Sequence, residues 1–204
     1  MAQPSIQRFS ETPRVYVADD FVSQQEIDHI LSRGADVAAL QLCGIKTRHD
    51  ETGFSFEMPV VSDTILEAYR ERLHRTIGVK SVFDGTMRFR RYGPGDGHPP
   101  HVDTYEIDGQ TLIITAHLFL TAPEVGGSTT FPDALPEAFE VKALPGRLAI
   151  WFSVAPDGTN DMLSMHAGAP VEQGLKTTLT YFIYEDRAQA AVQIAAAESL
   201  LPHA

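Results

Sequence analysis

Between residues 81 and 185, short apolar or alternating segments are separated by turns that contain glycine and proline, and no other feature of the sequence restricts the fold as strongly. The segments that we predict as strands are 86–92, 101–105, 112–120, 139–141, 148–152, 163–166 and 176–184. Many short strands at this spacing are typical of a β-sandwich or a jelly-roll barrel. The sequence therefore predicts a core of strands in this part of the chain, with no internal repeat.

The first of two predicted helices precedes this core. Residues 1–13 carry no regular pattern and are predicted to form an irregular arm, and residues 14–18 are predicted to form a short strand. Ser23 and Glu26 then form a capping box, in which the two side chains satisfy backbone donors at the start of a helix. Apolar residues follow at helical spacing, and Gly34 marks the expected end of this helix.

The second helix is predicted to begin at Ser62 or Asp63 and to end at Gly78. Its buried face is expected to comprise Ile65, Leu66, Tyr69, Leu73 and Ile77. His74 is expected on the solvent-exposed side with the helix arginines, because polar and charged residues are mostly exposed. The alanine-rich stretch after Arg187 predicts a third, terminal helix.

The length of 204 residues fits a single domain with a sizeable core. We expect one domain, 1–204, made of an N-terminal helical support (1–80), a jelly-roll core (81–185) and a helical tail (186–204). The polar, turn-rich stretch 46–58, which contains Phe54 and Phe56, leaves two interpretations open. It is either a loop that contacts the substrate or an ordinary hairpin.

The charge balance excludes some classes of partner. With 27 acidic residues against 16 Lys and Arg, the formal net charge of −11 argues against nonspecific binding to nucleic acid and to anionic membranes. The single cysteine, Cys43, allows no intrachain disulfide, which suits a reducing compartment. The N-terminus has no signal-peptide pattern and no apolar run reaches the length of a membrane span, so we expect a soluble cytoplasmic protein.

One motif carries candidate chemistry. His101 and Asp103 flank Val102, and His166 lies 65 residues further on. Two imidazoles and one carboxylate are the ligand set of non-haem Fe(II) oxygenases, which leaves open positions on the metal. Because residues two apart on a strand point to the same face, His101 and Asp103 are expected to bind one metal ion together, with His166 supplied by another strand.

Two other classes remain open at this point. The same three ligands suit a catalytic zinc ion, so a zinc-dependent hydrolase is one alternative. A non-catalytic jelly-roll protein that binds a sugar or metabolite is the other. Lys176 favours the oxygenase, because it opens a strand that is expected to be largely buried, and a buried ammonium needs a partner charge such as the carboxylate of a co-substrate.

Several further motifs resemble one family. They are Arg91-Tyr92-Gly93-Pro94-Gly95, the turn Gly126-Gly127-Ser128-Thr129-Thr130-Phe131-Pro132, the strand 144–152, and the segment from Met165-His166-Ala167-Gly168 to Gly174-Leu175-Lys176. Together with the His-x-Asp pair, they resemble the prolyl 4-hydroxylase-like branch of the Fe(II)/2-oxoglutarate dioxygenases. The resemblance covers about residues 14–185, which is nearly the whole chain.

The resemblance implies a double-stranded β-helix, a jelly roll of the cupin type, with two N-terminal helices packed on one sheet. It implies three iron ligands, which are His101, Asp103 and His166. Lys176 and Tyr92 would bind the 5-carboxylate of 2-oxoglutarate, and Thr115 would be a further co-substrate residue. Fe(II), 2-oxoglutarate and O₂ are the implied cofactor and co-substrates, and ascorbate is a further expected cofactor.

The implied reaction is hydroxylation of an unactivated C–H bond, with formation of succinate and CO₂. A prolyl residue in a peptide or protein is the leading substrate, and a free amino acid or another small metabolite is the alternative. No nucleic-acid or membrane partner is expected, and the protein is expected to be a monomer or a homodimer.

The chain departs from the family pattern at several polar residues. His117 shares a strand face with Thr115, where an apolar side chain is more usual, and is interpreted either as a satisfied core histidine or as a hydrogen-bonding neighbour of the site. His98 is not expected to be a metal ligand. Arg88, Arg90 and Arg91 either hold a substrate carboxylate or are surface charges.

Overall fold

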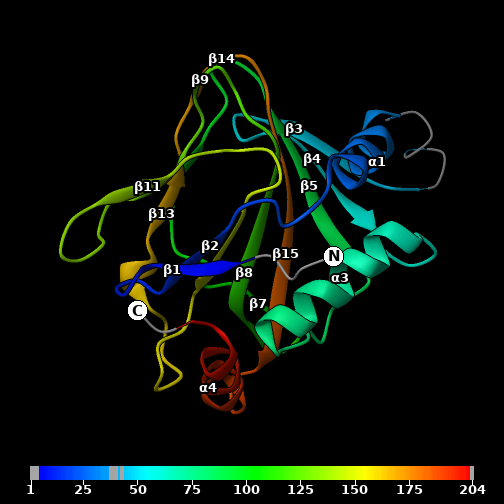
Figure 1. Cartoon of the computed structure of the whole chain (residues 1–204). Coiled ribbons are helices and arrows are strands. Elements are labelled where there is room, and N and C mark those ends of the chain that lie inside the picture. Colours follow the sequence, from blue (N-terminus) through cyan, green and yellow to red (C-terminus); the bar gives the residue numbers. More distant parts are fainter. Residues whose placement is uncertain (1–4, 37–40, 42–43, 203–204) are drawn as a thin grey trace.

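The computed structural model describes residues 5–36, 41 and 44–202, so Cys43 and the prediction that rests on it lie outside the described residues. A large antiparallel sheet dominates the fold (Figure 1). Its strands in order are β1 (Ile6–Ser10), β2 (Val15–Ala18), β12 (Leu148–Phe152), β8 (Gln110–Thr121), β15 (Lys176–Asp186), β5 (Thr86–Tyr92), β4 (Gly53–Pro59) and β3 (Thr47–Asp50), and β7 (Glu106–Ile107) pairs with β8.

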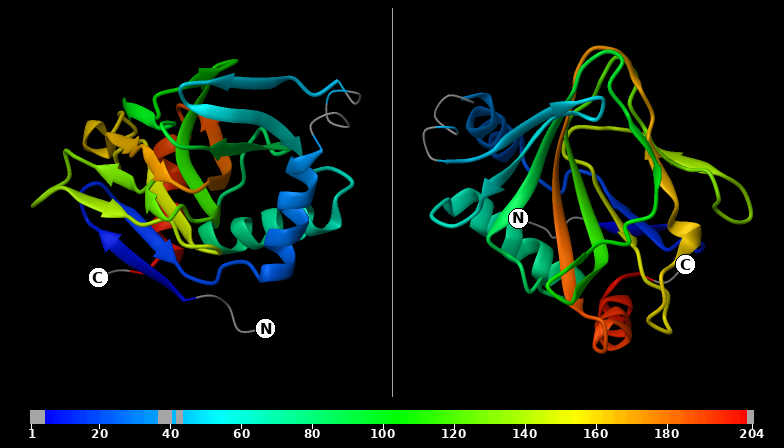
Figure 2. Two further views of the ribbon diagram at one scale, coloured as in Figure 1. Left: turned by 90° about the horizontal axis from the view of Figure 1, so that it is seen from above. Right: turned by 180° about the vertical axis from the view of Figure 1, so that it is seen from behind.

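A smaller sheet lies opposite the large one (Figure 2). Its strands in order are β11 (Phe139–Val141), β10 (Thr129–Phe131), β13 (His166–Gly168) and β6 (His98–His101), and a separate pair joins β14 (Val171–Gln173) to β9 (Val125–Gly126). One apolar cluster joins the two sheets, because it contains Phe131 and Val141 of the small sheet together with Ala149 and Trp151 of the large one. The two sheets thus form the walls of a jelly roll.

Strand alternation separates two faces of the large sheet. On β15, Leu179 and Tyr181 belong to the main hydrophobic cluster beneath the helices. Lys176, Thr178 and Thr180 alternate with them and line a cavity on the opposite face. Because the side-chain period of a strand is two, one strand supplies both packing and polar chemistry.

Helix α1 (Gln24–Ala35) begins at the predicted capping box, with Ser23 accepting from the backbone N–H of Glu26 and the Glu26 carboxylate accepting from that of Ser23. The predicted stop at Gly34 is wrong, because the helix continues to Ala35. Gly34 is instead a packing residue: a Cβ there would lie 2.3 Å from Phe89 Cζ on β5. The missing side chain lets α1 approach the sheet closely.

Helix α3 (Thr64–Ile77) begins at Asp63, whose carboxylate accepts from the backbone N–H groups of Ile65 and Leu66, and it ends at Gly78 with a φ of 79°. The expectation that His74 faces solvent is wrong, because its side chain is buried and its Nε2 lies 3.0 Å from the Tyr181 hydroxyl of β15. A polar helix residue can occupy a buried position when the neighbouring strand offers a hydrogen-bond partner.

The alanine-rich tail forms helix α4 (Ala190–Leu200), whose buried residues join the main hydrophobic cluster. Helices α1 and α3 lie on the outer face of the large sheet, away from the small sheet (Figures 1 and 2). None of the helices in the described ranges is long and apolar enough to cross a membrane.

The N-terminal part of the chain contributes more strands than predicted. Residues 6–10 were expected to be irregular, but they form β1 and pair with β2. The strand escapes a pattern search because it alternates half-buried and exposed residues and carries Gln7 and Arg8. The stretch 46–58 forms the hairpin of β3 and β4, which extends the same sheet, so residues 1–80 are not only a helical support.

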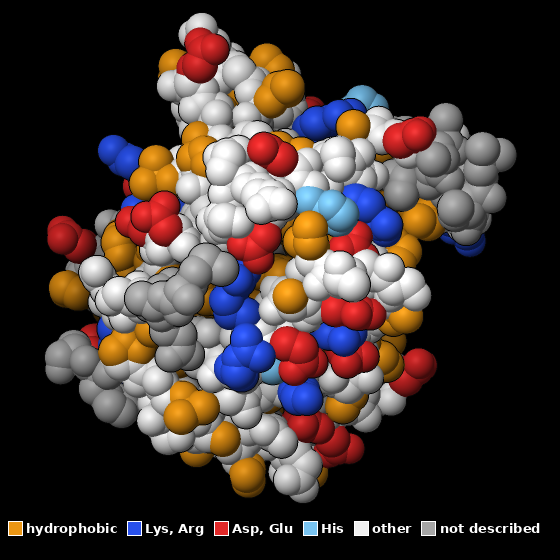
Figure 3. All heavy atoms as spheres, turned by 45° about the vertical axis from the view of Figure 1, so that its right-hand side comes forward, with side chains coloured by type: hydrophobic (Ala, Val, Ile, Leu, Met, Phe, Trp, Pro, Cys, Tyr) orange, Lys and Arg blue, Asp and Glu red, His pale blue; other side chains and the backbone are white. Residues whose placement is uncertain are grey.

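On the face of the molecule shown in Figure 3, basic side chains lie among acidic ones, and no broad basic patch forms there. This distribution agrees with the low ratio of basic to acidic residues in the sequence.

Candidate active site

The first metal-ligand candidate lies at the end of an edge strand. His101 is the last residue of β6, and it pairs with His166, the first residue of β13, in the small sheet. Pro99 and Pro100 are tolerated in β6 because an edge strand leaves one row of backbone groups unpaired. The pairing of β6 with β13 brings together two histidines that are 65 residues apart in the sequence.

Asp103 reaches the same point by a different route from the predicted one. The predicted strand 101–105 is wrong, because β6 ends at His101 and a tight turn follows, with the Thr104 N–H donating to the Val102 carbonyl at 2.8 Å. The turn, rather than strand alternation, directs the Asp103 carboxylate toward the histidines. The predicted strand 163–166 is likewise replaced by a 3₁₀ turn at Met162–Ser164, which leads into β13.

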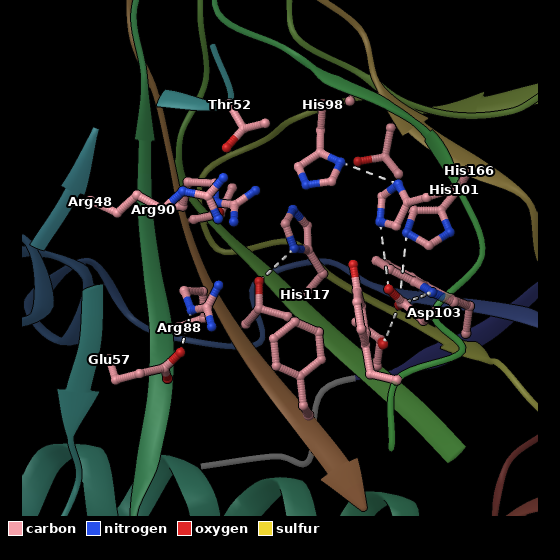
Figure 4. Close-up of a pocket in the computed structure, with 18 of the residues that line it drawn as sticks. Arg48, Thr52, Glu57, Arg88, Arg90, His98, His101, Asp103, His117 and His166 are labelled. Carbon is pink, nitrogen blue, oxygen red and sulfur yellow. Dashed lines mark hydrogen bonds and ion pairs between the residues drawn. The ribbon is translucent and has the colours of Figure 1, made fainter. Parts of the chain in front are cut away.

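His101, Asp103 and His166 converge (Figure 4). His101 Nε2 lies 3.5 Å from Asp103 Oδ1, and His166 Nε2 lies 3.7 Å from Asp103 Oδ2. One ligand atom from each residue lies within 4.8 Å of the other two, and no second cluster of this kind occurs among the described residues. One transition-metal ion fits among donors of this type and spacing. His98 lies beside His101 but outside the cluster.

Backbone carbonyls orient both imidazoles. His101 Nδ1 lies 2.9 Å from the Pro99 carbonyl oxygen, and His166 Nδ1 lies 2.9 Å from the Ser164 carbonyl oxygen. A carbonyl only accepts, so in each ring the proton belongs on Nδ1. The lone pair of each Nε2 is then free to bind a metal ion next to Asp103.

The Asp103 carboxylate is buried and held by two donors. The Thr115 hydroxyl donates to Asp103 Oδ2 at 2.7 Å, and the Trp151 indole N–H donates to the same oxygen at 3.1 Å. Burial alone would raise the pKa of Asp103, but the neighbouring His101 and His166 and the hydrogen bond from Thr115 lower it to about 2. Asp103 is therefore an anion at neutral pH, with Oδ2 engaged and Oδ1 nearer to His101.

A cavity of about 900 Å³ opens beside the three ligands and is large enough for a co-substrate and part of a substrate. Lys176 lines it and is only 2% exposed. No carboxylate within the described residues forms an ion pair with its ammonium, and burial together with the charge of Arg90 lowers the pKa of Lys176 to about 8. The Lys176 Nζ lies 5.0 Å from the centre of the Tyr92 ring. The structure thus brings Lys176 and Tyr92 together with a site that can accept an anion.

The three arginines of β5 divide between two faces. Arg88 and Arg90 line the cavity, whereas Arg91 lies on the opposite side, with its guanidinium 5.2 Å from the centre of the Phe54 ring. Arg88 is paired with Glu57 of β4. The hairpin β3–β4 also contributes cavity residues such as Thr52, so the stretch 46–58 is both a hairpin and part of the cavity wall.

His117 lies inside the cavity wall rather than among the metal ligands (Figure 4). Its Nδ1 lies 2.8 Å from the Thr180 hydroxyl, and its Nε2 has no hydrogen-bond partner. Burial, followed by the charge of Lys176, lowers the pKa of His117 well below its usual range, so the ring is neutral at physiological pH.

Sequence reasoning missed Trp151 and the threonines of β15. Trp151 is the only tryptophan, and it pairs in register with Thr115 across β12 and β8. Its signal was available, because an indole N–H in a buried strand requires an acceptor. Thr178 faces the cavity in the alternation that also places Lys176 there, but threonine is so common in strands that it gave no separate signal.

A family model for the 2OG-Fe(II) oxygenase superfamily matches residues 87–184, which run from β5 to β15 and include the three candidate ligands. Among curated relatives, "Probable prolyl 4-hydroxylase 7" of Arabidopsis thaliana is 24% identical over 210 residues, which cover 88% of this chain and 65% of that protein. The chain thus spans just under two thirds of the length of this relative.

Two solved structures share the fold. The viral collagen prolyl hydroxylase of Paramecium Bursaria Chlorella virus-1, in its 2OG complex, superposes with a TM-score of 0.65 at 22% identity, covering 83% of this chain and 95% of that one. A prolyl hydroxylase from Trichoplax adhaerens, in complex with a peptide fragment of the hypoxia inducible factor oxygen degradation domain, gives a TM-score of 0.59 at 15% identity, covering 87% and 86%.

These comparisons support a prolyl 4-hydroxylase-like 2OG-Fe(II) oxygenase, because the central part of the chain matches the superfamily and the relatives are named prolyl 4-hydroxylases. The predicted mainly β double-stranded β-helix fold is confirmed, and the predicted family resemblance is supported. This similarity, together with the cluster of His101, Asp103 and His166, supports an oxidoreductase that uses Fe(II) and 2-oxoglutarate. It also favours the oxygenase over the zinc hydrolase and the non-catalytic binding protein.

Proposed function

We propose that the protein hydroxylates a prolyl C–H bond in a peptide, with Fe(II) held by His101, Asp103 and His166. In the overall reaction, substrate C–H, 2-oxoglutarate and O₂ give substrate C–OH, succinate and CO₂. The observation that carries the proposal is the convergence of these three ligands on a cavity whose wall contains Lys176, a buried residue that no described carboxylate pairs with. Bound Fe(II) would supply the activation of O₂ that no side chain can provide.

The surrounding residues have separate proposed roles. Lys176 binds the distal carboxylate of 2-oxoglutarate, which gives its buried ammonium the counter-charge that the described residues do not supply. The Tyr92 hydroxyl assists it. For Thr115 the hydrogen bond to Asp103 favours a role in orienting that carboxylate, in place of the co-substrate contact that the resemblance implies.

Two observations support a prolyl peptide as the substrate. Relatives and structural neighbours are named prolyl hydroxylases, and one of them was solved with a peptide. Exposed apolar side chains, Phe83, Tyr105 and Ile107, also line the cavity, where they offer a surface for an apolar ring. A free amino acid or another small metabolite is the second candidate, because the cavity would hold either. The single-domain organisation, the cytoplasmic location, the use of ascorbate and the oligomeric state remain predictions.

A turnover screen tests the proposal. The protein is supplied with Fe(II), 2-oxoglutarate and O₂, and succinate release is measured with proline-containing peptides, free proline and related amino acids. Substrate-dependent succinate and a product heavier by one oxygen atom are expected. If no compound stimulates succinate release and 2-oxoglutarate is not consumed, the proposed function is wrong.

A further inference from the structure

Arg90 is the cavity arginine for which the described residues supply no acidic partner. Three arginines line the cavity: Arg48 is paired with Asp50, Arg88 is paired with Glu57, and Arg90 forms no ion pair within the described ranges. Arg90 is half-buried on β5, its Nε is buried without a hydrogen-bond partner, and its guanidinium lies 6.0 Å from the centre of the Tyr92 ring. A guanidinium remains charged at any physiological pH, so it retains an unmet requirement for an anion.

The balance of charge around the site indicates that the co-substrate alone does not meet this requirement. The proposed function places four positive charges here: two on Fe(II), one on Lys176 and one on Arg90. Asp103 and the two carboxylates of 2-oxoglutarate supply three negative charges. One positive charge is left over beside the metal and the co-substrate, in a cavity wall where screening is weaker than in water. Glu51 also lines the cavity, but it is exposed and forms no ion pair with Arg90.

Two uncharged polar groups without hydrogen-bond partners line the same cavity as Arg90. Thr178 lies opposite Arg90 in the register of β15 and β5, and its hydroxyl is buried with no hydrogen bond. His117 Nε2 is also buried without a partner, and both residues line the same cavity. Figure 4 shows His117 projecting between Arg90 and the metal-ligand candidates. Unsatisfied buried polar groups are uncommon in folded proteins and often mark a place where a ligand or water binds.

We infer that Arg90, with Thr178 and His117 beside it, binds a carboxylate of the substrate itself. This inference rests on the proposed function and narrows it. The substrate class becomes a carboxylic acid whose acid group remains in the site during hydroxylation. A free amino acid and the C-terminal residue of a peptide both carry such a group, whereas a prolyl residue inside a longer peptide does not.

The first test uses the unaltered protein with Fe(II) and 2-oxoglutarate in the absence of O₂, so that ligands bind without reacting. Trp151 is the only tryptophan and lines the cavity, so its fluorescence reports binding directly. Two pairs of ligands are compared: L-proline with prolinamide, and an acylated dipeptide ending in proline with its C-terminal amide. The acid is expected to bind about 10- to 100-fold more tightly than the amide in at least one pair, as is usual for a charged hydrogen bond.

The identity of that pair distinguishes a free amino acid from a peptide C-terminus. Equal binding of acid and amide in both pairs, or no measurable binding of either acid, overturns the inference. Neither result contradicts the proposed function, because that function is tested separately by succinate release with internal prolyl peptides. Failure of 2-oxoglutarate consumption under all conditions would be a failure of the proposed function itself.

The second test uses variants of β5. Arg90→Gln is expected to reduce the ratio of acid to amide affinity to about one, and Arg90→Lys is expected to retain part of it. Arg91→Gln is the matched control, because its side chain lies on the other face of the same strand, and the ratio should not change. An unchanged ratio in Arg90→Gln, or a loss of affinity confined to 2-oxoglutarate, overturns the inference.

Discussion

The two ends of the cavity differ in how far the protein satisfies its own polar groups. At the ligand end, each imidazole is oriented by a backbone carbonyl, and the Asp103 carboxylate accepts from Thr115 and Trp151. At the other end lies what we call the basic wall, made of Lys176, Arg90, Thr178 and His117, none of which is paired with a carboxylate of the described part of the chain. The ligand end is therefore organised before anything binds. The charged residues of the basic wall, in contrast, obtain their counter-charges only from bound co-substrate and substrate.

The largest effect is expected from a substitution that removes a metal ligand at the ligand end. His166→Ala removes one of three donors, so bound iron and substrate-dependent succinate release should fall to the level of a protein-free blank. Metal content after desalting and succinate release measure the two effects. His49→Ala is the control, because His49 is exposed on β3 and lies outside the cluster. Full succinate release by His166→Ala would contradict the assignment of the ligands.

The next largest effect is expected from a substitution that removes the ammonium of the basic wall. Lys176→Met removes the ammonium that we propose to bind 2-oxoglutarate, so the concentration of 2-oxoglutarate needed for half-maximal turnover should rise about 10- to 100-fold. Iron binding should persist, because Lys176 is not a member of the ligand cluster. If Lys176→Met loses iron but keeps its affinity for 2-oxoglutarate, Lys176 acts at the ligand end and the proposed role is wrong.

The same substitution has a second consequence for stability. The folded-state pKa of Lys176 is lowered to about 8 from 10.5, so burial of the charged form costs about 3 kcal/mol below pH 8. Without 2-oxoglutarate, Lys176→Met should therefore unfold with a free energy up to about 3 kcal/mol higher than the unaltered protein at pH 7. Because the unfolded chain retains the proton longer, this difference should shrink between about pH 8 and pH 10.5, as measured by denaturant titrations. A difference that does not depend on pH would show that the ammonium carries no such cost.

A smaller effect is expected at Thr115, and it tests whether this residue acts at the ligand end or in the basic wall. Thr115→Val removes a hydrogen bond to Asp103 and should weaken Fe(II) affinity about 10-fold, with little change in the affinity for 2-oxoglutarate. Thr115→Ser keeps the hydroxyl and serves as the control. If the affinity for 2-oxoglutarate falls instead, Thr115 belongs with the basic wall, as the family resemblance implied.

The smallest effect concerns Arg88, which lies two residues from Arg90 and already has Glu57 as a partner. Both side chains of the pair are partly exposed, so Arg88→Gln should change the free energy of unfolding by less than about 1 kcal/mol. The preference for acid over amide ligands should change less than about threefold. If Arg88→Gln lowers the acid-to-amide affinity ratio as much as Arg90→Gln does, then the ion pair with Glu57 does not prevent Arg88 from binding a ligand carboxylate.

The sequence predicted those parts of the site that follow from a local pattern. The strands 86–92, 139–141 and 148–152 match β5, β11 and β12, and the capping residues of α1 and α3 lie where expected. Each depends on neighbours a few residues away, through the alternation of a strand or the hydrogen bonds of a cap. The roles of the ligands and of Lys176 came from motifs and remain proposals.

Features that depend on distant contacts were not predictable in this way. His74 is buried because β15 offers the Tyr181 hydroxyl, and this partner lies 107 residues away. Trp151 reaches Asp103 only when β12 and β8 have paired. The turn that directs Asp103 also differs from the simple strand alternation that its spacing suggested. In each case tertiary structure supplied information that a single local window lacks.

The close contact between Gly34 and Phe89 connects the outside of the barrel to its chemistry. Phe89 packs against Phe56 with ring centres 5.0 Å apart, so it has little room to yield if residue 34 gains a methyl group. The flanking residues Arg88 and Arg90 point into the cavity from the same short strand. A methyl group at residue 34 on the outer face of the sheet should therefore push on β5, and with it on the two arginines that line the cavity on the inner face.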